Sequence, residues 1–127
     1  MRAKIMTIIV CCLLLLAASA VEQLSIRFVI NDALEETRAI MTDIRAERMD
    51  EASKKAHALD RTWDEKARII ELFVDHGAVD DVRYALSRLN AALESGDRAG
   101  AMIYTGELEG GIEQVYERQA LTLENLL

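Results

Sequence analysis

The segment ELFVDHG, residues 71–77, holds the side chains of this chain that are best suited to metal or proton chemistry. Glu71, Asp75 and His76 fall within six positions, and carboxylate and imidazole groups act both as zinc ligands and as general acids and bases. The same residue types are also typical of helix ends, because a cation is favoured at the negative end of the helix dipole. The surrounding sequence indicates whether these residues form a metal or proton-transfer site or only a helix end.

A complete metal site needs more ligands than this segment brings together. Zinc takes three or four converging ligands, and the chain has only two histidines and no cysteine beyond Cys12. The candidate ligands around one turn are Asp75, His76, Asp80 and Asp81. A di-iron bundle needs a glutamate three residues before a histidine on two facing helices, but Lys54 precedes His57 and Phe73 precedes His76. We therefore expect neither a metal nor a cofactor.

The helix-end interpretation accounts for the same residues. His76 would lie in the last turn of one helix, and Gly77 fits the left-handed C-cap position that follows it. Asp80 and Asp81 would lie in the first turn of the next helix, where acidic groups are favoured. The sequence thus favours a helix end, with the His76 ring available to bond a neighbouring helix.

Catalytic motifs do not occur in the rest of the sequence. It contains no Gly-x-Ser-x-Gly nucleophile motif and no phosphate-binding glycine loop. The carboxylates lie instead at helix-surface spacing with basic partners, as Glu47, Glu51 and Lys55 do at i, i+4 steps. Beyond residue 20 the chain has 13 basic and 22 acidic residues, a net charge of −9, which repels nucleic acid. We expect neither an enzyme nor a nucleic-acid-binding protein.

The N-terminal residues have the composition of an export signal. Arg2 and Lys4 precede an apolar run from Ile5 to Leu16 that only Thr7 interrupts. Ala18-Ser19-Ala20 has the small-x-small form of a signal-peptide cleavage site. Because the basic residues precede the apolar run, the N-terminus stays cytoplasmic and the remainder is exported.

The length of the apolar segment leaves open whether it is cleaved. As a helix, Ile5–Val21 spans ~25 Å, which is short against the ~30 Å of a bilayer's hydrocarbon core. The sequence therefore divides into a signal peptide or signal anchor, residues 1–21, and an extracytoplasmic domain, residues 22–127. That domain is either tethered to the cell membrane by a single span or secreted after cleavage near Ala20.

Apolar residues in the exported part recur at alternating spacings of three and four, which is typical of amphipathic helices. The four stripes are Ile26, Ile30, Ala33, Thr37, Ile40 and Ile44; Ala52, Ala56, Leu59, Trp63, Ala67, Ile70 and Val74; Val79, Val82, Leu86, Leu89 and Leu93; and Ala101, Thr105, Leu108, Ile112 and Val115. The last stripe fades at Gln119. Proline is absent, so nothing forces a break inside these helices.

The stripes predict an all-α fold, an antiparallel bundle of three to four helices after the N-terminal hydrophobic helix. The first helix covers roughly 22–46, the second runs from an N-cap at Asp50 to His76, and the third ends near Ser95-Gly96. Asp97 opens the fourth. One continuous helix through the first break is the alternative. Short connections make the second, third and fourth helices antiparallel neighbours.

Three residues on the predicted helices have both a structural and a binding interpretation. Trp63, the only tryptophan, falls on a core stripe and is expected to pack in the core, with a ligand platform as the alternative. Gly106 and Gly110 share a helix face, which favours close packing against another backbone. The alternative is a ligand-sized gap or a docked partner helix at these glycines.

Short motifs connect the chain with a known family. Trp63 is followed by Phe73 and His76 in an F-x-x-H pairing, and residues 122–127 read TLENLL, with Glu124 and Asn125 at its centre. In these features the chain resembles the bacterial domain-of-unknown-function family numbered 4363. The resemblance implies small exported helical proteins with no established activity, and its members look similar in keeping the N-terminal segment as an anchor.

The C-terminal leucines and the missing chemistry complete the expectations. Leu121, Leu123, Leu126 and Leu127 are expected to fold back on the bundle or to engage a partner. The favoured function is a membrane-tethered, non-enzymatic module that contacts a membrane-protein partner. The alternative is an extracytoplasmic sensor or binder of a small ligand or metal, with its pocket beside Trp63 and the glycines of the fourth helix.

Overall fold

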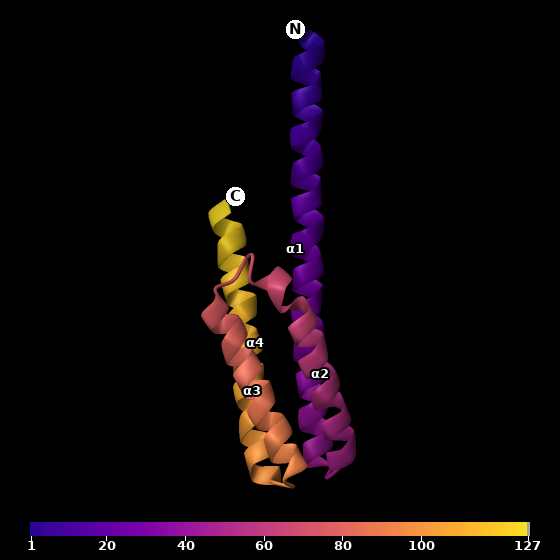
Figure 1. The fold of residues 1–127 in the computed structure, drawn as a ribbon, viewed down its shortest axis with the longest axis vertical. Coiled ribbons are helices and arrows are strands. Elements are labelled where there is room, and N and C mark those ends of the chain that lie inside the picture. The colour runs from indigo at the N-terminus through magenta and orange to yellow at the C-terminus, as the bar shows by residue number, and fades with distance from the viewer. Residues whose placement is uncertain (127) are drawn as a thin grey trace.

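The fold is all-α, as predicted, and consists of four helices over the part of the chain that the structure describes. The computed structural model describes residues 1–126. The helices are α1 (Arg2–Arg45), α2 (Met49–Ile70), α3 (His76–Glu94) and α4 (Arg98–Leu126). Figure 1 shows that the first half of α1 projects alone beyond a bundle that its second half forms with the other three helices.

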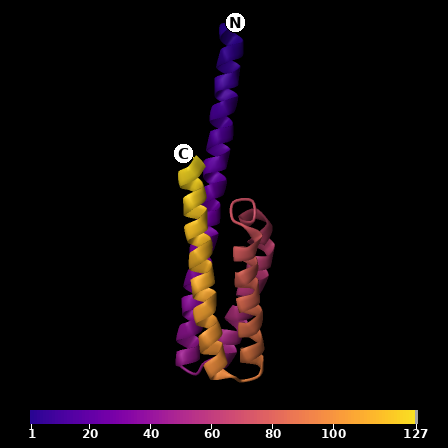
Figure 2. The ribbon, with the colours of Figure 1, turned by 90° about the vertical axis from the view of Figure 1, so that its left-hand side faces the viewer.

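The bundle is an up-down-up-down arrangement closed by its first and last helices. α1 packs against α2 and α4, and α3 packs against the same two helices. The α1–α2 and α3–α4 turns lie together at the end far from the N-terminus (Figures 1 and 2). The α2–α3 connection and the C-terminal half of α4 therefore lie at the end from which α1 emerges, which we call the anchor end.

The core is built from the predicted stripes. Every residue of the four stripes is buried, including the threonines at 37 and 105. The fully buried side chains with the largest volumes include Trp63, Ile30, Ile40, Leu86 and Ile112. Burying each large apolar side chain stabilises the fold by ~1.5–3 kcal/mol before the entropy of the chain is subtracted. Burial of these seams is therefore the main reason why the four helices associate.

The first break between helices is a true turn, so the alternative of one continuous helix is wrong. Glu47 adopts a left-handed φ of 62° between α1 and α2. Arg48 is the N-cap of α2, and Asp50, which was expected at that position, lies within the first turn. Arg98 Nε and Nη2 donate to the carbonyl oxygens of Ile44 and Arg45 at 3.2 Å. These bonds give the carbonyl groups at the end of α1 a hydrogen-bond donor from the start of α4.

The ELFVDHG segment is a connection and a helix start, so the prediction that α2 runs to His76 is wrong. α2 ends at Ile70, and Asp75 is the N-cap of α3, accepting a hydrogen bond from Ala78 N at 3.3 Å. His76 is the first residue of α3, and Gly77 is helical and not a left-handed C-cap. The aspartates at 80 and 81 consequently lie in the second turn of α3, one turn later than expected.

The α3–α4 connection agrees with the prediction. α3 ends at Glu94, and Gly96 has the left-handed φ of 72° that glycine adopts without steric cost. Asp97 precedes α4, and its Oδ1 accepts a hydrogen bond from Gly100 N at 2.9 Å. Glycine after the helix end and aspartate before the next start are sequence signals with a direct steric and hydrogen-bonding cause.

Candidate functional site

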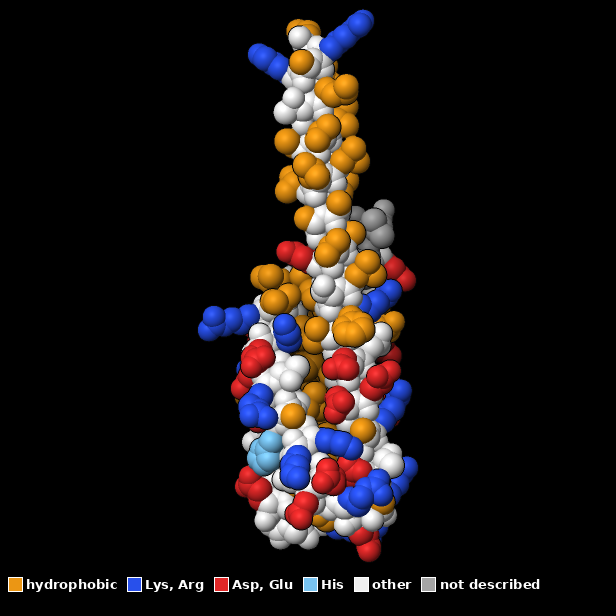
Figure 3. All heavy atoms as spheres, turned by 90° about the vertical axis from the view of Figure 1, so that its right-hand side faces the viewer, with side chains coloured by type: hydrophobic (Ala, Val, Ile, Leu, Met, Phe, Trp, Pro, Cys, Tyr) orange, Lys and Arg blue, Asp and Glu red, His pale blue; other side chains and the backbone are white. Residues whose placement is uncertain are grey.

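The projecting half of α1 is an apolar rod with no protein packed around it. Residues 1–22 are all exposed, and this is the one helix of the described chain that is long and apolar enough to cross a membrane, a property that export signals share. α1 continues without a break through Ala20 into the bundle. Figure 3 shows apolar side chains on the projecting rod and again where it meets the bundle.

Exposed apolar side chains surround the point where the rod leaves the bundle. We call this set the apolar collar: Leu24 and Phe28 on α1, Ile69 at the end of α2, Leu72 in the α2–α3 connection, and Leu121 on α4. Phe28 is 74% exposed and Leu72 is 77% exposed. Side chains of this size are normally buried, so a group of them at one end of a bundle indicates a contact surface.

The α1 and α2 members of the collar lie at the same level of the bundle. Ile69 lines a small hollow of about 70 Å³ together with Ser25, Ile26, Val29, Lys66 and Ile70. Of the α1 residues, Ser25 and Ile26 lie between Leu24 and Phe28, and Val29 directly follows Phe28. The α1 and α2 members of the collar therefore lie on neighbouring helices at the same end of the bundle.

Three polar contacts bring the C-terminal half of α4 to the same end. Gln119 Nε2 donates to the carbonyl oxygen of Gln23 at 3.2 Å. Thr122 Oγ1 donates to the carbonyl oxygen of Phe73 at 3.1 Å. Arg118 Nη1 forms an ion pair with Asp75. These bonds fasten α4 to α1 and to the α2–α3 connection and bring Leu121 to the same end of the bundle as the rest of the collar.

The Asp75 carboxylate has two roles at this end. It caps α3 through Ala78 N, and it pairs with Arg118 of α4. The Arg118 guanidinium, helped by the Ala78 N–H, holds the pKa of Asp75 below its ordinary value. The acidic residue that suggested metal chemistry in the sequence is thus an electrostatic connection between two helices.

His76 and Phe73 lie near each other in the sequence but make different contacts. The His76 side chain is exposed, and its Nδ1 lies 3.3 Å from Glu71 Oε2. Phe73 is half-buried, packs against the core and accepts the Thr122 bond through its carbonyl oxygen. Among residues 1–126, no group of three histidine, cysteine or acidic side chains is arranged to hold a metal ion.

Trp63 lies in the core, beside a groove. It is 1% exposed, and its indole Nε1 donates to the carbonyl oxygen of Val79 at 3.3 Å. A groove of about 300 Å³ between α1 and α2 reaches this side chain and has two acidic residues, Asp32 and Glu36, at its border. The remaining lining residues are Val29, Ala33, Ala58, Leu59 and Thr62.

The glycines of α4 differ from the expectation. A Cβ atom added at Gly106 or Gly110 meets nothing within 4 Å, so the predicted close packing at these positions is wrong. The close approach is at Gly111, where an added Cβ lies 3.3 Å from Val82 Cγ2. The predicted pocket shared by Trp63 and the α4 glycines is also wrong, because the groove at Trp63 is bordered by α1 and α2.

The C-terminal residues are described only in part. The side chains of Glu124 and Asn125 are exposed on the last turn of α4, and Leu121 is 57% exposed. Leu121 therefore does not fold back on the bundle, contrary to the favoured expectation. The leucine side chains at 123 and 126, and all of residue 127, lie outside the described part of the chain.

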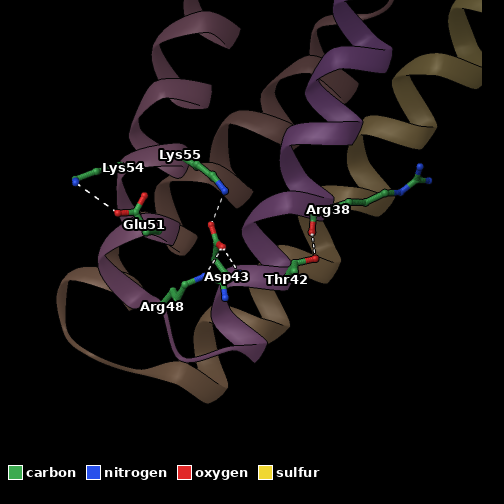
Figure 4. Close-up of polar contacts among 7 residues, drawn as sticks. All are labelled: Arg38, Thr42, Asp43, Arg48, Glu51, Lys54 and Lys55. Atoms are coloured by element: carbon green, nitrogen blue, oxygen red, sulfur yellow. Dashed lines mark hydrogen bonds and ion pairs between the residues drawn. The ribbon is translucent and has the colours of Figure 1, made fainter.

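A charged cluster at the opposite end of the bundle was not predicted from the sequence. The Asp43 side chain is 5% exposed and accepts bonds from Arg48 Nε and Nη2 at 3.1 and 2.9 Å and from Lys55 Nζ at 2.6 Å (Figure 4). Lys55 and then Arg48 hold its pKa below the ordinary value. The surface pairing predicted for Lys55 is therefore wrong, and Glu51 pairs with Lys54 at 3.7 Å. The sequence does contain a signal for this burial. Asp43 follows Ile40 by three residues, which places it on the helix face that carries the buried stripe.

Comparison with known proteins identifies the bundle. A family model described as Domain of unknown function (DUF4363) matches residues 23–126. Neither curated proteins nor solved structures give a match to the chain. The matched range begins directly after the exposed apolar rod and contains the collar, the polar fastening of α4 and the Asp43 cluster. The chain therefore belongs to the DUF4363 family, whose defining domain here is the four-helix bundle.

Proposed function

We propose that the protein is a membrane-tethered helical module that works outside the cytoplasm, without catalysis, by contacting a membrane-protein partner. The observation that carries this proposal is the exposed apolar half of α1, which runs unbroken into the bundle. Arg2 and Lys4 at its start favour a cytoplasmic N-terminus. A tether of this kind holds the bundle at the membrane, where its contacts are restricted to neighbours in the same bilayer.

The end of α4 supplies a surface for such a partner. Gln119 lies level with Gln23, and α4 continues for seven more residues, or about 10 Å, along the direction of the rod. Glu124 and Asn125 are exposed on this extension. At 1.5 Å per residue they lie ~6–8 Å past the level of Glu22 toward the membrane, so their polar side chains would pair with polar groups of a partner within the outer part of the bilayer.

Extraction and crosslinking test the proposal in cells. Alkaline extraction should leave the protein in the membrane fraction, and protease added to intact cells should cleave it. A photocrosslinking residue at Asn125 should capture a membrane protein, whereas the same residue at exposed Ser87 of α3 should not. Release by alkali would contradict the tether. Equal crosslinking from both positions, or from neither, would contradict a partner at the end of α4.

The groove at Trp63 supports a second candidate, an extracytoplasmic binder of a small cation. Asp32 and Glu36 lie one helical turn apart at its border and Trp63 at its base, a combination that attracts an amine or a divalent cation. Titration with spermidine and with Ca²⁺ should then change Trp63 emission. The change should disappear in Asp32→Asn/Glu36→Gln and persist in the matched pair Asp80→Asn/Asp81→Asn on α3. No change with either cation would remove this candidate.

A further inference from the structure

We propose that the apolar collar seats the anchor end of the bundle on the outer surface of the phospholipid bilayer. In this arrangement Leu24, Phe28, Ile69, Leu72 and Leu121 reach the boundary between headgroups and acyl chains. The inference rests on the proposed tethering and adds a second, separate membrane contact, which fixes how the bundle is oriented at the end of its tether.

The register along α1 places the collar at the headgroup layer. Glu22 is the first charged residue after Lys4 and marks the outer end of the apolar span. Counted from Glu22 at 1.5 Å per residue, Leu24 lies ~3 Å and Phe28 ~9 Å farther from the membrane centre. The headgroup region on one side of a bilayer is roughly 5–8 Å thick. Leu24 therefore starts within this layer and Phe28 just outside it, and both side chains lean back toward the N-terminus of α1 and the acyl chains.

The distribution of exposed apolar residues favours lipid at this end. Beyond the rod, the structure exposes seven large apolar side chains over the described residues, and five of them form the collar. The other two, Tyr84 and Ile103, lie apart on α3 and α4. The collar is also continuous with the rod, since Leu24 follows Val21 by less than one turn. A surface that continues an apolar span at its outer end meets the outer layer of the same bilayer.

Basic side chains lie where the phosphates would be. Lys66 lines the small hollow beside Ile69, and Arg68 precedes Ile69 in α2. Both are exposed, and within residues 1–126 no carboxylate lies within 4.0 Å of either cation. A lysine or arginine next to an apolar surface extends its charged end to phosphate while its stem stays with the acyl chains. The net charge of −9 beyond residue 20 opposes binding to anionic lipid, so the apolar side chains must provide the contact.

A depth measurement on the full chain in vesicles tests the seat. In a Cys11→Ala/Cys12→Ala background, single cysteines are placed by Leu14→Cys in the rod, Leu72→Cys in the collar and Ile103→Cys at the far end, and each is labelled with an environment-sensitive fluorophore. The proteins are reconstituted into phosphatidylcholine vesicles carrying a nitroxide-labelled lipid. We expect strong quenching at positions 14 and 72, with quenching at 72 roughly threefold or more above that at 103.

The three labels separate the two membrane contacts. Quenching at position 14, with position 72 no more quenched than position 103, would overturn the seat and leave the tether intact. Lack of quenching at position 14 would overturn both. Phe28→Ser/Ile69→Ser in the Leu72→Cys background tests whether the whole collar acts together, and it should reduce quenching at 72 without changing that at 14. Unchanged quenching at 72 would show insertion of the fluorophore itself and would contradict the seat.

Discussion

Replacing Gln119 with methionine should stabilise the protein, although the substitution removes a hydrogen bond. Gln119 is 1% exposed and follows the core stripe of α4. Its Nε2 donates to the carbonyl oxygen of Gln23, but its Oε1 has no hydrogen-bond partner among the described residues. The Gln23 carbonyl lies inside α1, where the helix itself uses it as an acceptor. Methionine has a similar length and leaves no polar atom unpaired.

The direction of the change in unfolding free energy follows from the sizes of three contributions. A buried polar group without a partner costs ~1–3 kcal/mol, and the single hydrogen bond returns ~0.5–1.5 kcal/mol. The methionine thioether adds apolar contacts in place of the amide. The net gain is about 1 kcal/mol, which raises the melting temperature of a bundle of this size by about 4 °C.

Thermal unfolding of the full chain in mild detergent measures the change. Trp63 emission reports on the bundle core, and circular dichroism reports on all helices. Gln119→Ala is the control, because it removes the amide but leaves a void, and its free energy of unfolding should be lower than that of the methionine variant by ~2 kcal/mol or more. A methionine variant that melts at or below the wild type would refute the reasoning. It would show that Gln119 Oε1 has a hydrogen-bond partner, such as an internal water.

Other substitutions have outcomes that the structure determines. Gly106→Ala and Gly110→Ala should each raise stability by ~0.5–1 kcal/mol in thermal unfolding, because the new methyl group meets no atom within 4 Å and alanine favours the helix. Gly111→Ala should give a smaller gain or a loss, because its Cβ would press on the α3 side chain at 3.3 Å. Since the pKa of Asp43 is lowered in the folded state, its contribution is full above its ordinary value of 3.8 and is lost as the pH falls below it. The melting temperature should therefore fall on acidification below about pH 4, and Asp43→Asn should melt lower at neutral pH and lose less on acidification. Trp63→Phe should destabilise the bundle by roughly 1–2 kcal/mol, through the lost indole bond and a small void, when unfolding is followed by circular dichroism.

The fold followed from the sequence because the core is made of regularly spaced apolar residues. All four stripes became buried seams, and the signals at Gly96 and Asp97 gave the α3–α4 turn correctly. The predicted end of α2 was wrong for a physical reason. Leu72 and Phe73 are apolar and continue a helical pattern by type, so only the capping of α3 by Asp75 shows that a new helix has begun.

The functional residues were harder to predict because they depend on contacts between helices. The buried Asp43 is satisfied by residues five and twelve positions away, and no local pattern indicates that pairing. The exposure of Gly110 was available from the sequence. It lies two residues from both Leu108 and Ile112, so it must face away from the buried stripe. The collar was not predicted because the residue type alone does not distinguish an exposed leucine or phenylalanine from a buried one.

The two ends of the bundle are held by different kinds of contact, and this difference bears on the proposed seat. At the far end Asp43 is enclosed, and three bonds from two basic residues satisfy its carboxylate. At the anchor end the Asp75–Arg118 pair is exposed to solvent. Two of the three buried polar atoms without a partner in the described chain, Arg27 Nε and Gln119 Oε1, also lie at this end, and the third, Asn90 Oδ1, lies toward the other. An exposed ion pair contributes little net stability, so α4 is held less firmly here than at its start. A bundle fixed at its far end can adjust the spacing of its helices at the anchor end, and a lipid surface that covers the collar would supply apolar contacts that the exposed collar side chains do not make within the protein.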